Sequence, residues 1–310
     1  MITLGGRVIG HGRPAFVIAE AGVNHNGDVA LAERLVDAAA EAGADAVKFQ
    51  TWVTERLVAP EAPMAEYQAR NTGVTESQFA MLKRLELSYD AFRRVKGYAE
   101  RRGIMFLSTP DEEASADFLE SLDVAAFKIG SGELTNLPYL AHLARKGRPL
   151  ILSTGMGDLE EVRAAVETIR RHGDPPLVLL HCVSNYPTEP EDCNLACLAT
   201  LRAAFPDVPV GFSDHTIGVA VPLAAVALGA CVIEKHLTLD RALPGPDQRV
   251  SATPEALRAL VDGIRAVEAA RGDGIKAPRP GEVETRALVR KSLVARRAIR
   301  RGEALDAGAL

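Results

Sequence analysis

Cysteine is scarce in this 310-residue sequence, and aromatic residues make up only 5% of it. The four cysteines are Cys182, Cys193, Cys197 and Cys231, and no two of them form a C-x-x-C pair. This scarcity excludes a disulfide scaffold and is typical of a reducing compartment, so we expect a cytoplasmic protein. Cys193 and Cys197 are spaced four residues apart on an expected helix, where we interpret them as small buried side chains rather than metal ligands.

The sequence also lacks a basic excess, a long uncharged segment and a signal peptide. Its 36 basic and 41 acidic side chains give a net charge of −5, so we do not expect nucleic acid as a partner. The uncharged stretch from Ile217 to Ile233 is shorter than the roughly 20 residues a bilayer requires, and Pro222 and Gly229 interrupt it. We therefore expect no membrane association, and a buried helix followed by a buried strand in this stretch.

Short apolar runs alternate with longer amphipathic segments along most of the chain. The runs cover residues 15–22, 44–50, 104–110, 124–132, 149–155, 176–184, 208–215 and 230–236. They are continuously apolar, as parallel strands covered on both faces are. Eight such repeats predict an α/β fold, a (β/α)8 TIM barrel over residues 1–270. The longer connection 50–104 predicts extra helices or a loop over the barrel mouth.

The composition changes after about residue 271. Residues 271–284 are rich in glycine, proline and charge, which predicts a linker. Residues 285–310 then resemble the start of a new small unit, with one or two strands expected within 292–306. That segment is too short to fold alone, so we expect an incomplete C-terminal domain.

Polar and charged side chains stand at the end of every expected strand. In chain order the ends carry Glu20; Lys48 and Gln50; Ser108 and Thr109; Lys128, Ser131 and Glu133; Ser153 and Thr154; His181, Ser184, Asn185 and Tyr186; Ser213, Asp214 and His215; and Glu234, Lys235 and His236. A single polar group at a strand end can be explained as a structural residue. Burying all of these groups without hydrogen-bond partners would cost much free energy. In a barrel they converge on one rim, which predicts an active site there.

The residue types at this rim indicate a metal and two anions. His215 and His236 end neighbouring strands, so their imidazoles can meet at a metal ion, with hydrogen-bonded core histidines as the alternative. Lys128 lies among the glycines and hydroxyls of "KIGSGE" and "LSTGMG", which suit a phosphate. Lys48 suits a second anion such as a carboxylate. The nearby carboxylates that favour a metal are Glu20, Asp214, Glu234 and Asp247.

Eight segments together resemble the sialic acid synthase (N-acetylneuraminate synthase) family, which includes the legionaminic acid synthases. They are "AEAGVNHNG", "VKFQT", "FKIGSGE", "STGM", "SNYPT", "FSDHTIG", "IEKHLTLD" and "PGPD", and they occur in the family's order over about residues 1–270. The resemblance implies condensation of phosphoenolpyruvate with an open-chain N-acylated amino sugar. N-acetylmannosamine is the first candidate for that sugar, and the products would be N-acetylneuraminic acid and phosphate. It also implies Mn²⁺ or Mg²⁺, a homodimer and a C-terminal antifreeze-like (SAF) domain.

The resemblance also implies residue roles. It implies that His215 and His236 bind the metal. It implies that Lys48, Asn185 and Ser213 bind the carboxylate of phosphoenolpyruvate. It implies that the phosphate is bound by Thr109, Lys128, Ser131 and Ser153, and that the sugar is bound by Gln50, Tyr186 and Asp247. Glu20 and Glu133 match carboxylates near the reacting carbons, so we expect Glu20, Glu133, Lys48 and Lys128 to be catalytic.

One departure and three alternatives stay open at this level. The family's terminal domain supplies an arginine, in an Arg-Pro-Gly context, to the partner subunit's sugar site. Arg279 has that context but lies in the expected linker, so we give it no such role, and the swapped dimer is in doubt. The alternatives are a 2,4-diacetamido-2,4,6-trideoxy sugar as acceptor, giving legionaminic acid, a Schiff-base aldolase using Lys48 or Lys128, and a non-catalytic sugar- or phosphate-binding barrel. The "PGPD" segment disfavours pseudaminic acid.

Overall fold

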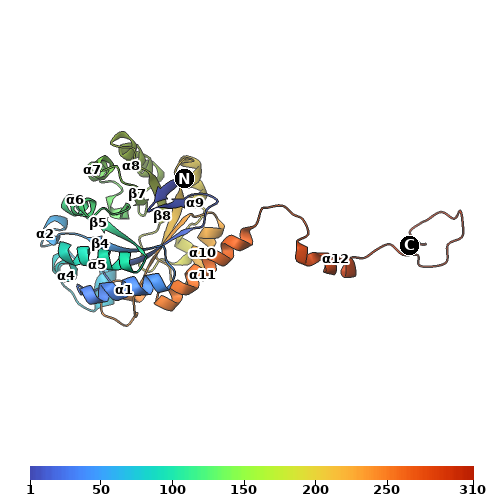
Figure 1. The fold of residues 1–310 in the computed structure, drawn as a ribbon, viewed down its shortest axis with the longest axis horizontal. Coiled ribbons are helices and arrows are strands. Elements are labelled where there is room, and N and C mark those ends of the chain that lie inside the picture. The colour runs from blue at the N-terminus through green and yellow to red at the C-terminus, as the bar shows by residue number, and fades with distance from the viewer. The chain divides into compact units, whose positions relative to one another are not determined.

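The computed structural model describes residues 1–310, apart from the side chains at positions 66, 67 and 70. The chain divides into two compact units, Met1–Ala270 and Arg271–Leu310. In the first unit, eight parallel strands close into a barrel that is surrounded by helices (Figure 1). The prediction of a (β/α)8 barrel is confirmed.

The barrel strands are buried along almost their whole length. In chain order they are β3 Phe16–Gly22, β4 Ala46–Thr51, β5 Met105–Pro110, β6 Phe127–Ile129, β7 Leu150–Ser153, β8 Leu177–Cys182, β9 Val210–Asp214 and β10 Val232–His236. Neighbours in sequence are neighbours in the sheet, and β10 closes the barrel against β3. The register places His236 beside Glu20 and Glu20 beside Lys48. The polar strand ends therefore lie at similar heights around one rim.

Most of the helices that cover the barrel begin at a side chain that accepts from an amide of the first turn. They are α1 Val29–Glu41, α5 Tyr89–Arg101, α6 Glu113–Ser121, α7 Leu137–Arg145, α8 Leu159–Arg171, α9 Cys197–Ala204, α10 Ala220–Ala227 and α11 Pro254–Arg271. At α8 the Asp158 side chain accepts from the Glu161 amide at 2.9 Å, and the Glu161 side chain accepts from the Asp158 amide at 2.9 Å. This reciprocal pair is a capping box, and its three-residue spacing can be read in the sequence "DLEE".

The long connection between β4 and α5 contains extra helices, as predicted. They are α2 Thr54–Leu57, α3 Glu66–Thr72 and α4 Gln78–Leu85. The expectation that Cys193 and Cys197 share a helix is wrong, because α9 begins at Cys197 and Cys193 follows a short 3-10 turn, Pro190–Asp192. Cys193 is nevertheless buried, which agrees with its interpretation as a packing residue.

A hairpin that the sequence analysis missed covers the N-terminal end of the barrel. Its strands β1 Ile2–Leu4 and β2 Arg7–Ile9 pair antiparallel. Leu4 and Ile9 are fully buried in the apolar cluster that fills the barrel interior. With this end covered, the polar ends of the strands are left at the opposite, C-terminal end.

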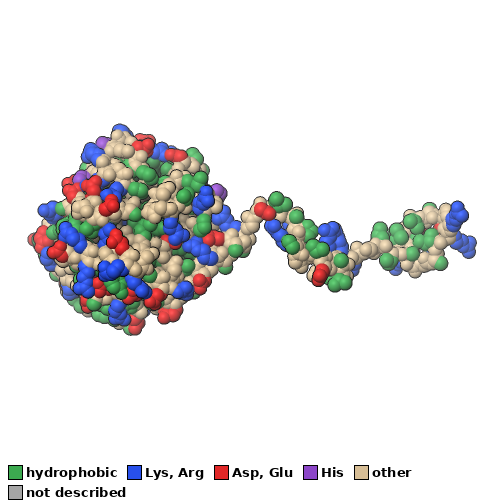
Figure 2. Space-filling model, viewed as in Figure 1, with side chains coloured by type: hydrophobic (Ala, Val, Ile, Leu, Met, Phe, Trp, Pro, Cys, Tyr) green, Lys and Arg blue, Asp and Glu red, His purple; other side chains and the backbone are tan. Residues whose placement is uncertain are grey.

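The second unit, Arg271–Leu310, contains the helix α12 Val283–Val289, and no strand is present in the described residues 271–310. The prediction of one or two strands within 292–306 is therefore wrong. The physical reason is that apolar side chains such as Leu288, Leu293 and Val294 find no core within this unit and stay exposed. Figure 2 shows hydrophobic side chains on the surface of this unit. The assignment of residues 285–310 to an antifreeze-like domain stays a prediction.

Basic and acidic side chains are interspersed over the face of the barrel unit that Figure 2 shows. Within the described part of the chain, every helix is too short or too polar to cross a membrane.

Candidate active site

The C-terminal ends of the barrel strands surround a cavity of about 360 Å³. Every barrel strand or the loop directly after it contributes to the wall. The lining residues are Glu20, Lys48, Gln50, Thr109, Asp111, Lys128, Gly130, Ser131, Gly132, Ser153, Met156, Cys182, Ser184, Tyr186, Ser213, His215, Glu234 and His236. The convergence of polar strand ends that the sequence predicts is therefore present in the fold.

All but three of the predicted site residues lie in this wall. Glu133, in a short 3-10 turn Ser131–Glu133, is not among the lining residues and accepts from Asn136 Nδ2 at 2.7 Å. Asn185 is exposed in the loop after β8. Asp247 is buried in the loop after β10, outside the cavity wall. The structure therefore does not place these three residues in the cavity wall with the other residues that were predicted to form the site.

Lys48 lies between two carboxylates at the bottom of the cavity. Its Nζ is 2.6 Å from Glu20 Oε2 and 4.0 Å from Glu234 Oε2, and it donates to Thr109 Oγ1 at 3.0 Å. Burial alone would lower the pKa of Lys48, but the two glutamates raise it above its ordinary value. Lys48 is therefore a held positive charge, suited to binding an anion rather than to attacking a carbonyl.

Lys128 forms a second positive centre on the other side of Glu234. Its Nζ donates to Ser153 Oγ at 2.8 Å and lies 3.4 Å from Glu234 Oε1, which also accepts from Ser213 Oγ at 2.9 Å. Burial lowers the pKa of Lys128. Opposite Lys128 in the same wall, Ser131 Oγ accepts from the Gly155 amide at 3.0 Å. Hydroxyls, a backbone amide and an ammonium together suit the oxygens of a phosphate.

Glu20 and Glu234 are pushed in opposite directions by this arrangement. Burial, reinforced by the charge of Glu234, raises the pKa of Glu20 although Lys48 opposes it. Burial would also raise the pKa of Glu234, but Lys128 and Lys48 outweigh it and lower that pKa. Two carboxyls with separated pKa values are the usual basis for assigning an ion-holding group and a proton-transferring group. Here Glu234 holds the lysines and Glu20 is the proton-transferring candidate.

The two histidines at the ends of β9 and β10 face one another. The ring centroids of His215 and His236 are 5.4 Å apart, and the Tyr186 ring lies 4.1 Å from that of His215. His215 Nδ1 lies 2.8 Å from the Val183 carbonyl, which only accepts, so Nδ1 carries the hydrogen and Nε2 has the lone pair in the neutral ring. His236 Nδ1 is buried and has no hydrogen-bond partner among the described residues.

These features fit a divalent metal ion held by a histidine pair. Burial, and then the charge of His215, keeps the pKa of His236 well below its ordinary value, so its imidazole is neutral and able to bind a metal. Within the described residues no cluster of three or more His, Cys, Asp or Glu side chains has metal-binding geometry. A metal at this pair would keep further positions for water and substrate oxygens.

The lining residues to which the sequence analysis gave no site role include Asp111 and Cys182. Asp111 directly follows the last residue of β5, and the signal was available because an acid follows the strand in "LSTPDE". Burial, with Glu133 and Glu20, raises the pKa of Asp111 to about 7, against the opposing charge of Lys48. Cys182 Sγ lies 3.9 Å from His215 Nδ1, a contact that the sequence alone does not indicate.

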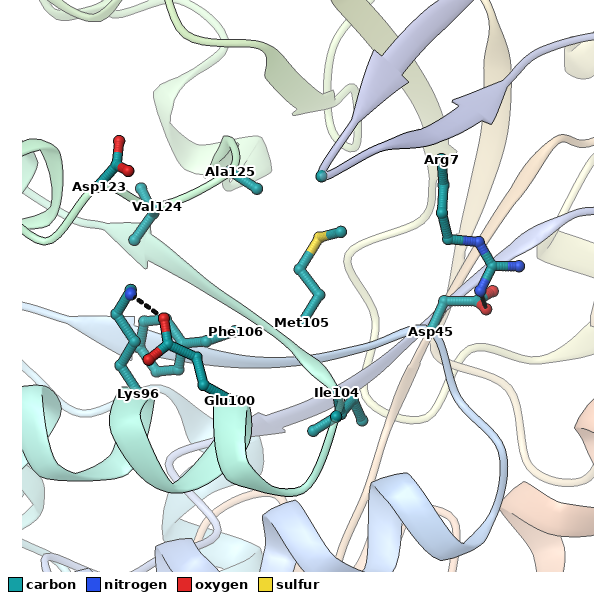
Figure 3. Close-up of a pocket in the computed structure, with 12 residues that line it drawn as sticks. Arg7, Asp45, Lys96, Glu100, Ile104, Met105, Phe106, Asp123, Val124 and Ala125 are labelled. Atoms are coloured by element: carbon teal, nitrogen blue, oxygen red, sulfur yellow. Dashed lines mark hydrogen bonds and ion pairs between the residues drawn. The ribbon is translucent and has the colours of Figure 1, made fainter.

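A second cavity, of about 390 Å³, lies at the N-terminal end of β5 (Figure 3). Its charged groups are paired, Arg7 with Asp45, Lys96 with Glu100, and Asp123 with Arg148 beside it. Among its described lining residues there is no histidine and no hydroxyl side chain. The polar side chains that suit a reaction line the cavity at the C-terminal end of the barrel, which is where barrel enzymes have their active sites.

The comparisons with known proteins agree with the site. A model of the NeuB family matches residues 35–276. The chain belongs to the NeuB family. It is 50% identical over 297 residues to a protein of Legionella pneumophila named N,N'-diacetyllegionaminic acid synthase, covering 94% of this chain and 83% of that one. A Campylobacter jejuni protein of the same name is 44% identical over 300 residues, with 96% and 90% covered.

A solved structure is similar over almost the same extent. The N-acetylneuraminic acid (sialic acid) synthetase of Leptospira borgpetersenii, in complex with citrate, superposes with a TM-score of 0.80 at 35% identity, covering 94% of this chain and 98% of that chain. The resemblance to the sialic and legionaminic acid synthases that the sequence motifs indicated is confirmed. This chain is thus a NeuB-family member whose relatives include sugar-acid synthases.

Proposed function

We propose that the barrel condenses phosphoenolpyruvate with an open-chain N-acylated amino sugar, forming a nine-carbon 2-keto sugar acid and releasing phosphate. The observation that carries this proposal is one cavity that contains two buried lysines, a set of hydroxyls and a facing histidine pair. A substrate with both a phosphate and a carboxylate would use both lysines. Family membership supports the same reaction.

Each anion has its own set of groups in the proposed complex. The phosphate would lie against Lys128 and Ser153, with the hydroxyls of Ser131 and Thr109 in the same wall as further partners. The carboxylate would lie against Lys48 and Ser213. Binding an anion at Lys48 would compete with Glu20, which now accepts from that lysine at 2.6 Å. Glu20 would then be released to act on a proton near the reacting carbons.

His215 and His236 would hold the Mn²⁺ or Mg²⁺ ion. When bound, that ion would supply Lewis-acid polarisation of the sugar aldehyde. The protein's own groups account for the other steps. The enol carbon of phosphoenolpyruvate forms the carbon–carbon bond with the aldehyde carbon, and positive charge develops on the adjacent carbon. Glu20, whose raised pKa places it near neutrality, takes a proton from the water that adds there. The former aldehyde oxygen, left as an alkoxide when the carbon–carbon bond formed, takes up the proton that Glu20 removed. The tetrahedral intermediate then gives its hydroxyl proton to the departing phosphate as its carbon–oxygen bond to phosphate breaks, which leaves the ketone.

The acceptor has two candidates. The two relatives of highest identity reported above are named for legionaminic acid, which supports a 2,4-diacetamido-2,4,6-trideoxy sugar. The structural neighbour named for sialic acid, at 35% identity, supports N-acetylmannosamine. We rank the diacetamido sugar first on identity.

The deciding experiment measures phosphate release from phosphoenolpyruvate and Mn²⁺ with the diacetamido sugar, with N-acetylmannosamine, and with neither. Release that requires one sugar and disappears with chelator would support the synthase and identify its acceptor. Reduction with borohydride that traps a keto acid on Lys128, whose pKa burial lowers, would instead support the aldolase. Phosphoenolpyruvate binding without release with either sugar would support a non-catalytic barrel. The homodimer stays a prediction, which light scattering on the full chain tests.

A further inference from the structure

A further buried ion pair, outside the cavity wall, joins β9 and β10 next to the histidines. Lys235 Nζ lies 2.6 Å from Asp214 Oδ2, and the side chains are 3% and 0% exposed. Lys235 and Asp214 are register partners in the parallel pairing of the two strands. Neither side chain lines the cavity, because successive strand residues face opposite sides and Ser213 and Glu234 point inward.

The pair is extended by the residue after His215. Lys235 Nζ also donates to the Thr216 carbonyl at 2.5 Å, and Asp214 Oδ1 accepts from the Thr216 amide at 2.9 Å. His215 therefore lies between two residues, 214 and 216, that are both fixed to Lys235. His236 is the next residue after Lys235. The backbone on both sides of one histidine is thus tied to the backbone that carries the other.

We propose that Asp214 and Lys235 form a positioning clamp that holds His215 and His236 at a separation suited to one divalent cation. The proposal rests on the metal-binding role given to the two histidines above. Buried ion pairs seldom add net stability, because desolvation offsets their attraction, so stability alone does not account for this one. Fixing two strand ends in register is a role that an apolar pair would not fill.

The clamp is tested by isothermal titration of the full chain with Mn²⁺, without substrate. Lys235→Met alone leaves Asp214 buried and unpaired and can unfold the barrel, so the main variant is Asp214→Asn/Lys235→Met. This double variant buries no unpaired charge and loses both bonds from Lys235. We expect it to fold and to bind Mn²⁺ about 10- to 100-fold more weakly, the usual cost of losing groups that orient metal ligands.

The matched control is Arg265→Met, which removes ion pairs to Asp45 and Glu268, beside the start of β3 and away from the histidines. It should lower the melting temperature without changing Mn²⁺ affinity. If the double variant folds and binds Mn²⁺ with unchanged affinity, the clamp is overturned and the histidine assignment stands. An equal loss of Mn²⁺ affinity in Arg265→Met would have the same consequence. Absence of Mn²⁺ binding in the unchanged protein, or unchanged binding in His215→Ala, would overturn the histidine assignment and the clamp with it.

Discussion

The Glu20 carboxylate and the Lys48 ammonium, on the adjacent strands β3 and β4, form a 2.6 Å ion pair inside the cavity. Gln50 Nε2 donates to the other Glu20 oxygen at 3.1 Å. Glu20 is thus held on both oxygens, yet burial keeps its pKa above the ordinary value. This combination gives a positioned carboxyl that can change its protonation near neutral pH.

We predict that Glu20→Gln lowers kcat by about 10²–10⁴-fold, the usual contribution of a general base. The amide keeps the side chain's shape and Glu234 still faces Lys48, so the variant should fold, with a lower melting temperature because Lys48 loses its nearer counter-charge. In the unchanged protein kcat should fall as pH drops below the raised pKa of Glu20, because the carboxyl is then protonated and accepts no proton. Glu20→Gln should lose that limb of the pH profile. The same limb in both proteins would contradict the assignment.

Much of the barrel was predictable, because each strand is a largely apolar run and most of the surrounding helices begin at a side-chain cap. The capping box at Asp158 shows this, since local hydrogen bonds alone determine it. The hairpin β1–β2 was not predictable, because its strands have three residues each and Leu4 and Ile9 gain their burial only from the barrel.

The site residues on strands were predictable for the same reason, and those on loops only in part: Ser131 and Tyr186 lie in the cavity wall, whereas Asn185 and Asp247 do not. Lys48, Lys128 and His236 follow from strand alternation, which fixes the side of the sheet they face. Asp247 lies in the loop after β10, whose path depends on distant contacts such as Asn26 Nδ2 to the Pro244 carbonyl at 2.7 Å. No local pattern encodes that path, so the sequence did not indicate that Asp247 lies outside the cavity wall.

Asp247 provides a prediction about stability and pH. Burial raises its pKa from 3.8 to about 6, and its Oδ1 has no hydrogen-bond partner among the described residues. A raised carboxyl pKa gives a contribution to stability that is fully present below pH 3.8 and is lost as pH rises through 6. The loss amounts to about 3 kcal/mol.

We therefore expect Asp247→Asn to raise the free energy of unfolding of the metal-free protein at pH 8 and to change it little at pH 4. Urea unfolding at the two pH values measures this. A matched control is Asp90→Asn on α5, where the exposed Asp90 contacts only the exposed Arg93. A stabilisation by Asp247→Asn that is equal at both pH values would argue against a titrating carboxyl.

The histidine pair provides a prediction about metal affinity. We expect His215→Ala to weaken Mn²⁺ binding at least 100-fold, because one of two protein ligands is lost. His142→Ala, at a partly exposed histidine on α7, should leave the affinity unchanged. In the unchanged protein the contact with Cys182 and the Val183 carbonyl outweighs burial and raises the pKa of His215. Proton competition should therefore weaken Mn²⁺ binding as pH falls through that raised pKa. A pH-independent affinity would contradict a His215 ligand.

The strand pairing that supports the histidines depends on a glycine. A Cβ added at Gly211 in β9 would lie 2.5 Å from the Val232 carbonyl oxygen and 2.7 Å from Leu180 Cδ2. Because the first contact is with backbone, β9 and β10 would have to separate. Gly211→Ala should cost about 1–3 kcal/mol, the usual penalty for overpacking. The control Gly97→Ala, in helix α5, meets only a flexible arginine end at 3.6 Å and should stabilise by up to about 1 kcal/mol. Unfolding in urea compares the two, and a neutral Gly211→Ala would show that the strands tolerate a wider spacing at this position.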